Sequence, residues 1–295
     1  MNRNRSTAVL IIGVVLLAAA AIFWIHGHGG RPQGALASAP DAATPVSAPV
    51  DKPIDKNNDT ERPAPTDAKQ PSIASEAPAR VGEILDFAAD VSKLSNVANL
   101  RLQTAERRNF LGKSALHLQA FAHTENPLRM VFELDDQFDS YSDAGTLTSL
   151  QYEMHLNERG QKVDSVQRMT ATGEEPAPAN ATETRVVPGT RDPLGLMQYL
   201  RSVDWSKTHE VRSPVYDGHK LYDVRASLSA GFEVVAVPAG KYTASKIGIR
   251  VFEDGTEMKD ASFTLYLANN PQHTPVLLEA VMPFATARVQ LAKEK

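Results

Sequence analysis

Apolar and polar residues alternate along most of the chain from residue 81 onward. Residues 150–157 alternate without a break, which is the strongest strand signal in the sequence. The turn Glu158-Arg159-Gly160 follows, and residues 161–169 return as the partner strand. The same period of two indicates further strands over residues 81–91, 97–104, 113–123, 128–138, 185–187, 219–229, 232–237, 241–252, 261–268, 275–282 and 285–292. Because the links between them are short, we expect antiparallel pairing.

One stretch breaks this pattern and reads as a short helix. Asp192 is a good N-cap residue, and Pro193 falls at the first helical position, where its missing N–H costs nothing. The following residues form a wide apolar arc that consists of Leu196, Met197, Tyr199 and Leu200. A helix this short is unstable alone in water, so it must pack on the strands around it.

These elements predict a mainly β fold. One face of each strand is apolar, so the sheet buries one side and leaves the other in water. A long sheet of this kind twists and curls until its concave face becomes a core. We therefore expect an antiparallel curled sheet, an open or nearly closed β-barrel, with the one short helix packed inside. A flat two-sheet sandwich is the alternative.

The start of the chain has a different character. Residues 7–25 contain no charged residue, and as a helix they measure about 29 Å, close to the thickness of a hydrocarbon core. Arg3 and Arg5 precede them, which favours a cytoplasmic N-terminus (residues 1–6) and an exported remainder. We predict a single transmembrane signal-anchor helix, and hence a membrane partner.

A cleaved signal peptide is the competing interpretation of this segment. Ala35-Leu36-Ala37 resembles a small-x-small cleavage site. The apolar stretch exceeds the roughly 7–15 residues of a typical signal peptide, and the candidate site lies ten residues beyond Ile25. An uncleaved anchor is therefore favoured over a cleaved, fully released protein.

Residues 26–80 form a Pro/Ala-rich linker. Nine of the nineteen prolines lie within residues 31–80, and that stretch has no aromatic residue. Such a segment cannot bury enough apolar surface to offset the entropy lost on ordering, so we expect a disordered tether. The remaining residues, 81–295, form the predicted antiparallel β domain.

Several stretches of this domain, taken in order, resemble the bacterial envelope proteins grouped as "domain of unknown function 3108". They read GEIL at 82–85, FLGKSALHL at 110–118, DQFDSYSD at 136–143, DPLGLMQYLR at 192–201, VYDGHKLY at 215–222 and FEVVAVPAGKY at 232–242. The resemblance implies a mostly antiparallel β domain in the cell envelope and no particular activity. With the predicted anchor, it implies a single-pass protein of the bacterial inner membrane whose C-terminal domain lies in the periplasm.

The sequence offers little that indicates catalysis. The net charge is −4 at pH 7, so nothing favours nucleic acid as a partner. The chain has no cysteine, which excludes thiolate metal sites and a cysteine nucleophile. No Gly-x-Ser-x-Gly motif occurs, and the histidines of the β domain show no metal-ligand spacing. We therefore predict no catalytic residues, no metal and no cofactor, and an enzyme is not favoured.

Glu233 is the most interesting carboxylate, because it lies in an otherwise apolar strand between Phe232 and Val234. A buried carboxylate with a perturbed pKa would mark a functional site. A structural ion pair with Arg201 or Arg225 is the favoured interpretation, since no second acid or base accompanies it.

Two functions remain open from the sequence. The first is the binding of an apolar or lipid-like ligand in the concave side of the sheet, and an internal void of about 300 Å³ or more would favour it. The second is a tethered interaction or scaffold protein that binds another envelope protein. The candidate cavity or structural residues are Leu196, Met197, Tyr199, Leu200 and Glu233, with Asp192 as the helix cap.

Overall fold

The structure is a computed structural model that describes residues 80–171, 182–283 and 285–295. Within these ranges it contains one α-helix, one short 3₁₀ helix and fourteen strands. The helices are α2 (Pro193–Ser202) and η1 (Leu128–Met130). The strands are β1 (Ile84–Val91), β2 (Leu94–Phe110), β3 (Lys113–Thr124), β4 (Asp135–Asp143), β5 (Ser149–Glu158), β6 (Gln161–Ala171), β7 (Thr182–Val186), β8 (Glu210–Tyr216), β9 (Leu221–Val237), β10 (Gly240–Glu253), β11 (Thr256–Glu257), β12 (Ser262–Ala268), β13 (Pro275–Met282) and β14 (Ala285–Glu294).

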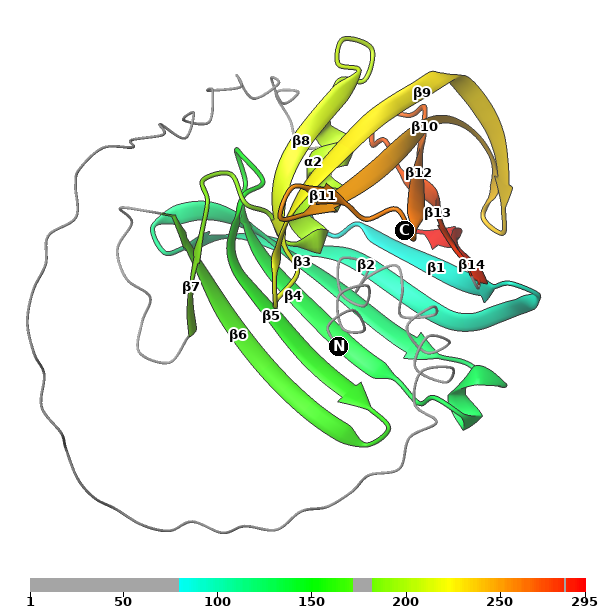
Figure 1. Cartoon of the computed structure of the whole chain (residues 1–295), viewed down its shortest axis with the longest axis horizontal. Helices are drawn as coiled ribbons and strands as arrows, with labels where there is room; N and C mark the ends of the chain where they lie inside the picture. Colours follow the sequence, from blue (N-terminus) through cyan, green and yellow to red (C-terminus); the bar gives the residue numbers. More distant parts are fainter. Residues whose placement is uncertain (1–79, 172–181, 284) are drawn as a thin grey trace, which may run out of the picture.

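All fourteen strands belong to one sheet that curls into a nearly closed barrel. The strands follow the order β7-β6-β5-β4-β3-β2-β1-β14-β13-β12-β10-β9-β8, with β11 paired to β10. The two ends of this order meet where the Arg191 amide donates to the Pro214 carbonyl (3.0 Å) and the Tyr216 amide donates to the Arg191 carbonyl (2.8 Å). Figure 1 shows β2–β6 as one curved wall, with β8–β10 on the opposite side.

The core lies inside this curl and includes the helix. Alternate residues of the strands point inward, and the buried apolar cluster joins both walls to α2. Leu118 and Tyr152 come from one wall, Leu265 from the other and Leu200 from the helix, and each is at most 2% exposed. The expected mainly β, nearly closed barrel with one packed helix is therefore confirmed.

Most predicted strands occur where alternation placed them. Residues 150–157 and 161–169 form the β5–β6 hairpin, and residues 275–282 form β13. β7 is an exception to antiparallel pairing, because it runs parallel to β6. Residues 172–181 separate β6 from β7 in the sequence. The expectation of antiparallel pairing, which depended on short links between strands, therefore does not apply to β7.

The strand predicted over residues 128–138 is wrong in its first half. Residues 128–130 form η1, and strand β4 begins only at Asp135. The Thr124 hydroxyl donates to the Phe132 carbonyl (2.8 Å) and accepts from the Leu134 amide (3.1 Å), which holds a compact connection in place of an extended strand. Met130 is 78% exposed as a result.

The predicted cytoplasmic tail (1–6), anchor helix (7–25) and nearly all of the linker (26–80) lie outside the described residues. Within the described ranges, no helix combines the length and the apolar character that a membrane crossing requires.

Candidate functional site

The most highly organised polar cluster of the domain surrounds Asp192 at the start of α2. Its carboxylate accepts hydrogen bonds from the amides of Leu194 and Gly195, both at 2.8 Å, which makes it the helix N-cap. The second carboxylate oxygen accepts from the hydroxyls of Ser140 (2.5 Å) and Ser149. The side chain is fully buried, and the hydrogen bonds from Ser140 and Ser149 fix the helix to the β4–β5 hairpin.

These contacts make Asp192 a structural anchor. Burial raises the pKa of Asp192, while the hydrogen bonds from Ser140, Ser149 and the helix amides act in the opposite direction. The carboxylate has no exposed surface from which to exchange a proton with a substrate. The residue therefore positions the helix, and its geometry gives no support to a catalytic role.

Gly195 lets the helix approach the β4–β5 hairpin closely. A Cβ atom at this position would lie 3.0 Å from the Ser142 hydroxyl, 3.1 Å from the Ser149 hydroxyl and 3.2 Å from the Leu147 carbonyl. The glycine is thus required by space, since any side chain would push the helix away from the serines that bond Asp192.

Arg191 ties the helix to the seam of the barrel. Its guanidinium carbon lies 3.7 Å from the centre of the Tyr199 ring. The same group donates to the Ser213 hydroxyl (3.0 Å) and to the Thr146 carbonyl (2.9 Å). Burial lowers the pKa of Arg191 to about 10. Tyr199, one of the residues predicted to line a cavity, is 2% exposed and packs against the guanidinium group of Arg191.

The far end of α2 is fixed by a buried ion pair. Both guanidinium Nη atoms of Arg201 donate to the carboxylate oxygens of Glu83, each at 2.7 Å. Arg201 is 1% exposed in its side chain and Glu83 is 9% exposed. Arg201 also donates to the Gln272 carbonyl (3.0 Å), so β1, α2 and the β12–β13 connection meet there.

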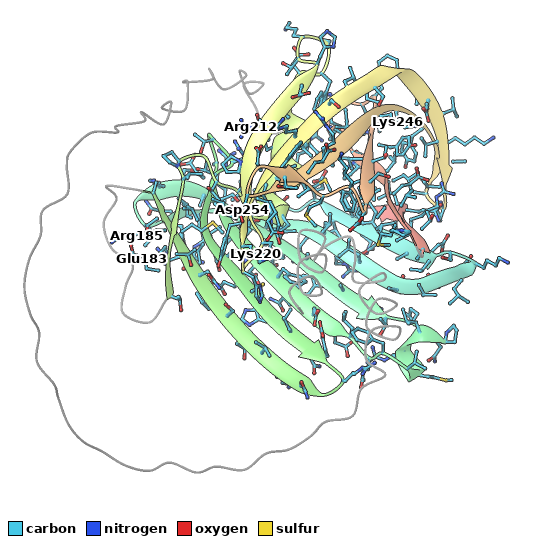
Figure 2. The ribbon with its side chains drawn as sticks, viewed as in Figure 1. Glu183, Arg185, Arg212, Lys220, Lys246 and Asp254 are labelled. Carbon is cyan, nitrogen blue, oxygen red and sulfur yellow. The ribbon has the colours of Figure 1, made fainter. Side chains whose placement is uncertain are left out.

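The expected surroundings of Glu233 are wrong. Its side chain is 48% exposed, and its partner is Lys246, with 3.4 Å between the charged atoms. Figure 2 labels Lys246, which lies on β10. Arg201 pairs with Glu83, and Arg225 lies within 3.2 Å of the Asp223 carboxylate. Glu233 lies where β9 extends beyond its pairing with β8, which ends at Ser227. Its apolar sequence neighbours therefore do not bury it.

A small cavity lies between α2 and strands β1–β3. Its volume is about 20 Å³, which is room for about one water molecule. The buried Thr104 hydroxyl lines this cavity and has no hydrogen-bond partner in the described part of the chain. The lining also includes Leu85, Leu102, Leu118, Met197 and Gln198.

The four apolar candidates on α2 thus have different surroundings. Met197 lines the small cavity, whereas Leu200 is 2% exposed and fully part of the core. Leu196 is partly buried against the same core, and Tyr199 lies under Arg191. Of these four residues, only Met197 lines the cavity found among the described residues.

Sequence reasoning missed Asp136, a second buried carboxylate at the opposite end of β4. One of its oxygens accepts from the Asn157 amide (2.8 Å), and the other is buried without a partner among the described residues. Burial raises the pKa of Asp136 to about 7, and the nearby carboxylate of Glu158 adds to the rise. Burial also raises the pKa of Glu158. The signal in the sequence was an aspartate at an inward position of an alternating segment.

The two histidines on polar strand faces are satisfied by neighbouring side chains. His117 contacts the Asp139 carboxylate at 2.6 Å, and its ring stacks on Tyr141 with 4.5 Å between centres. His155 contacts the Asp164 carboxylate at 2.7 Å. In the part of the chain that the structure describes, no group of three or more His, Cys, Asp or Glu side chains is arranged to hold a metal ion.

Comparison with known protein families identifies the domain. The family model described as "Protein of unknown function (DUF3108)" matches residues 88–292, which include the Asp192 cluster and the barrel around it. The chain belongs to the DUF3108 family. The resemblance expected from the sequence is confirmed. No curated protein matches the chain.

Three solved structures align with this DUF3108 chain at low sequence identity. A β-barrel-like protein of DUF1849 from Brucella abortus is 12% identical, with 72% of this chain and 96% of that chain covered and a TM-score of 0.46. A protein from Bacteroides fragilis, described as exported, is 12% identical; 74% of this chain and 97% of that chain are covered, with a TM-score of 0.32. A protein from Parabacteroides distasonis, described as a lipoprotein, is 12% identical; 77% of this chain and 100% of that chain are covered, with a TM-score of 0.33.

Proposed function

We propose that this DUF3108 protein is an exported protein of the bacterial envelope, held at the inner membrane by residues 7–25, whose β domain binds another envelope protein. The linker of residues 26–80 separates the domain from the membrane, and its proline content extends its reach. The domain acts as a tethered interaction module and does not carry an acyl chain in its interior.

One observation carries the preference for an interaction module. Ligand pockets for molecules of drug or lipid size measure about 300–1,000 Å³, whereas the cavity beside α2 measures about 20 Å³. The buried side chains of Leu85 and Leu118 line this cavity, and so does the buried Arg201–Glu83 ion pair. An acyl chain would have to displace the helix together with its buried hydrogen bonds.

Lipid content provides the first test. The full-length protein is extracted in a mild detergent, and native mass spectrometry measures what remains bound. We expect the mass of the protein without a stoichiometric acyl ligand. A bound lipid at one copy per chain that resists detergent exchange would support the carrier function and contradict the interaction module.

Crosslinking in cells provides the second test. A photoreactive residue replaces the exposed Val163 in one strain and the buried Leu200 in another. We expect a discrete protein adduct from a surface position such as Val163 and none from Leu200. Lipid adducts from Leu200, with no protein adduct from any exposed position, would overturn the proposal.

The membrane attachment is tested separately by the mass of the mature N-terminus and by membrane fractionation. We expect an intact N-terminus and recovery with the inner membrane. A mature chain that begins at Ser38 would replace the anchor with a cleaved signal peptide while leaving the function of the domain open.

A further inference from the structure

The last third of β9 leaves one edge of the sheet without a strand. β8 pairs with β9 over residues 221–227 only, whereas β10 pairs with it as far as Val237. Residues 232–237 therefore have β10 on one side and no strand on the other side within the described ranges. The Ala239 amide donates to the Leu291 carbonyl (3.0 Å), which holds this hairpin end on the body of the barrel.

The register shows which backbone groups remain free. A two-residue turn joins Val237 to Gly240, so these two residues form a hydrogen-bonded pair, and bonding alternates along the ladder from there. The backbone groups of Val235 and Glu233 then point to β10. Those of Phe232, Val234 and Ala236 point to the free edge. We call residues 232–237 the open edge.

The outward side chains of the open edge are apolar and exposed. Phe232 is 63% exposed and Val234 is 74% exposed, whereas Val235 on the opposite face is 7% exposed. Phe and Val are among the residues with the highest strand propensity. Exposed edges with such side chains readily pair with another strand.

A second unpaired edge in the same sheet is protected by charge. β7 pairs with β6 only from Gln167 onward, so residues 161–166 also lack a described neighbour on that side. Lys162 and Asp164 flank Val163 there on the outward face, and outward charges of this kind disfavour strand addition. The outward side chains of the open edge, Phe232, Val234 and Ala236, carry no charge, and its one carboxylate, Glu233, is paired with Lys246.

The sequence of the open edge is complementary to itself. In an antiparallel pair, directly opposed residues share a face of the sheet, so a two-fold axis passes through a residue and not between two residues. An axis at a residue whose backbone groups point to the free edge makes that residue a hydrogen-bonded pair with its own copy. With the axis at Val234, the two Val234 side chains face each other and Phe232 of each copy faces Ala236 of the other. Glu233 then faces Val235, so no like charges are opposed, and the Glu233–Lys246 pair is left intact.

We propose that the open edge pairs antiparallel with the open edge of a second copy of this chain, with Val234 on the two-fold axis. The pairing joins two barrels into one continuous sheet across a contact of five residues, 232–236. A contact this short is weak on its own, and confinement of both chains to one membrane surface raises their effective concentration. The proposal concerns assembly of the chain with itself and does not require the envelope partner proposed above.

Disulfide trapping tests the register directly. The chain has no cysteine, so Val234→Cys introduces the only thiol. Cα atoms of a hydrogen-bonded antiparallel pair are about 5.5 Å apart, within the range a disulfide spans. We expect the oxidised full-length variant to form a covalent dimer, at a level at least about tenfold above the matched control Val163→Cys on the protected edge. Equal dimer yields from the two variants would overturn the proposal.

Sedimentation of the unmodified full-length chain in detergent provides the second measurement. We expect the dimer to form as the protein concentration is raised to about 100 μM, the range of weak interfaces. The Val234→Lys variant should remain a monomer over the same range. Val234 is exposed, so the lysine should leave the fold and its melting temperature unchanged. A wild-type monomer throughout this range, or a Val234→Lys variant that remains dimeric, would contradict pairing at this edge.

Discussion

Two buried aspartates at opposite ends of β4 differ in how their charge is accommodated. Asp192 meets the Ser140 end of the strand and accepts four hydrogen bonds. Asp136 lies at the other end, where one carboxylate oxygen accepts a single bond and the other has no partner in the described chain. Both side chains are at most 3% exposed.

The difference shows that burial alone does not make a carboxylate functional or stabilising. Donors from the helix amides and two serines make Asp192 part of the joint that fixes α2 inside the barrel. Burial raises the pKa of both carboxylates, and at Asp136, where a single hydrogen bond opposes it, the pKa rises to about 7. The Asp192 carboxylate is therefore the better satisfied of the two, and Asp136 carries an electrostatic cost at neutral pH.

Removal of the Asp192 carboxylate should have the largest effect. Asp192→Ala loses the helix cap and removes the buried acceptor of two amides and two serine hydroxyls, which should reduce the free energy of unfolding by about 3 kcal/mol. Urea unfolding of the full-length protein measures this difference. Asp192→Asn retains an acceptor for the helix amides and should lose roughly 1 kcal/mol. Equal losses in the two variants would mean that the hydrogen bonds do not set the stability.

Neutralisation of Asp136 should stabilise the protein. Its pKa is 3.8 in the unfolded chain and about 7 in the folded one, so the contribution of Asp136 to folding stability is most favourable below about pH 4 and falls as the pH rises to 7. Asp136→Asn stays neutral and escapes this fall. We expect no difference from wild type at pH 4 and a gain on the order of 2 kcal/mol at pH 8.

The measurement is urea unfolding of both proteins at pH 4, 6 and 8, with the difference taken at each pH. Carboxylates remote from this site titrate identically in the two chains, so the difference reports Asp136 together with its coupling to Asp135 and Glu158. A constant difference across the three pH values would contradict the raised pKa.

A side chain at Gly195 should weaken the joint to a lesser degree. Alanine favours a helix by about 1 kcal/mol over glycine, but its Cβ atom would lie 3.0–3.2 Å from three atoms of the β4–β5 hairpin. We expect Gly195→Ala to lower the free energy of unfolding by roughly 1 kcal/mol. Gly248→Ala is the control, because its Cβ atom would have ordinary contacts at 3.9 Å. A stabilised Gly195→Ala variant would show that the helix is not pressed against the hairpin.

The smallest effect is expected at Glu233. Its ion pair with Lys246 is exposed, so Glu233→Gln should change the free energy of unfolding by less than about 0.5 kcal/mol. Thermal unfolding at low and at high salt measures this. A loss of several kcal/mol would show that Glu233 has buried contacts in solution.

Local patterns were sufficient to predict much of the fold. Alternation gave β13 with the observed bounds, and the Asp192-Pro193 pair gave the start of α2, because both signals depend on residues next to each other in the chain. Alternation did not predict β8, because Pro214 interrupts its pattern. The proline is tolerated because β8 is an edge strand.

The site depended on contacts that the sequence pattern does not encode. The serines that bond Asp192 are 52 and 43 residues away in the chain, and they lie on strands whose inward positions are polar. Glu233 has apolar neighbours but lies beyond the end of the β8 pairing, so its burial depended on where an adjacent strand stops.

Hydrogen exchange along α2 tests most directly whether the helix is fixed inside the barrel. In the full-length protein, the amides of residues 194–202 should exchange as slowly as those of β3 and β4, because they open only when the whole barrel unfolds. Exchange of these amides as fast as that of the exposed β9–β10 hairpin end would contradict the account, since the helix would then leave the barrel without unfolding it.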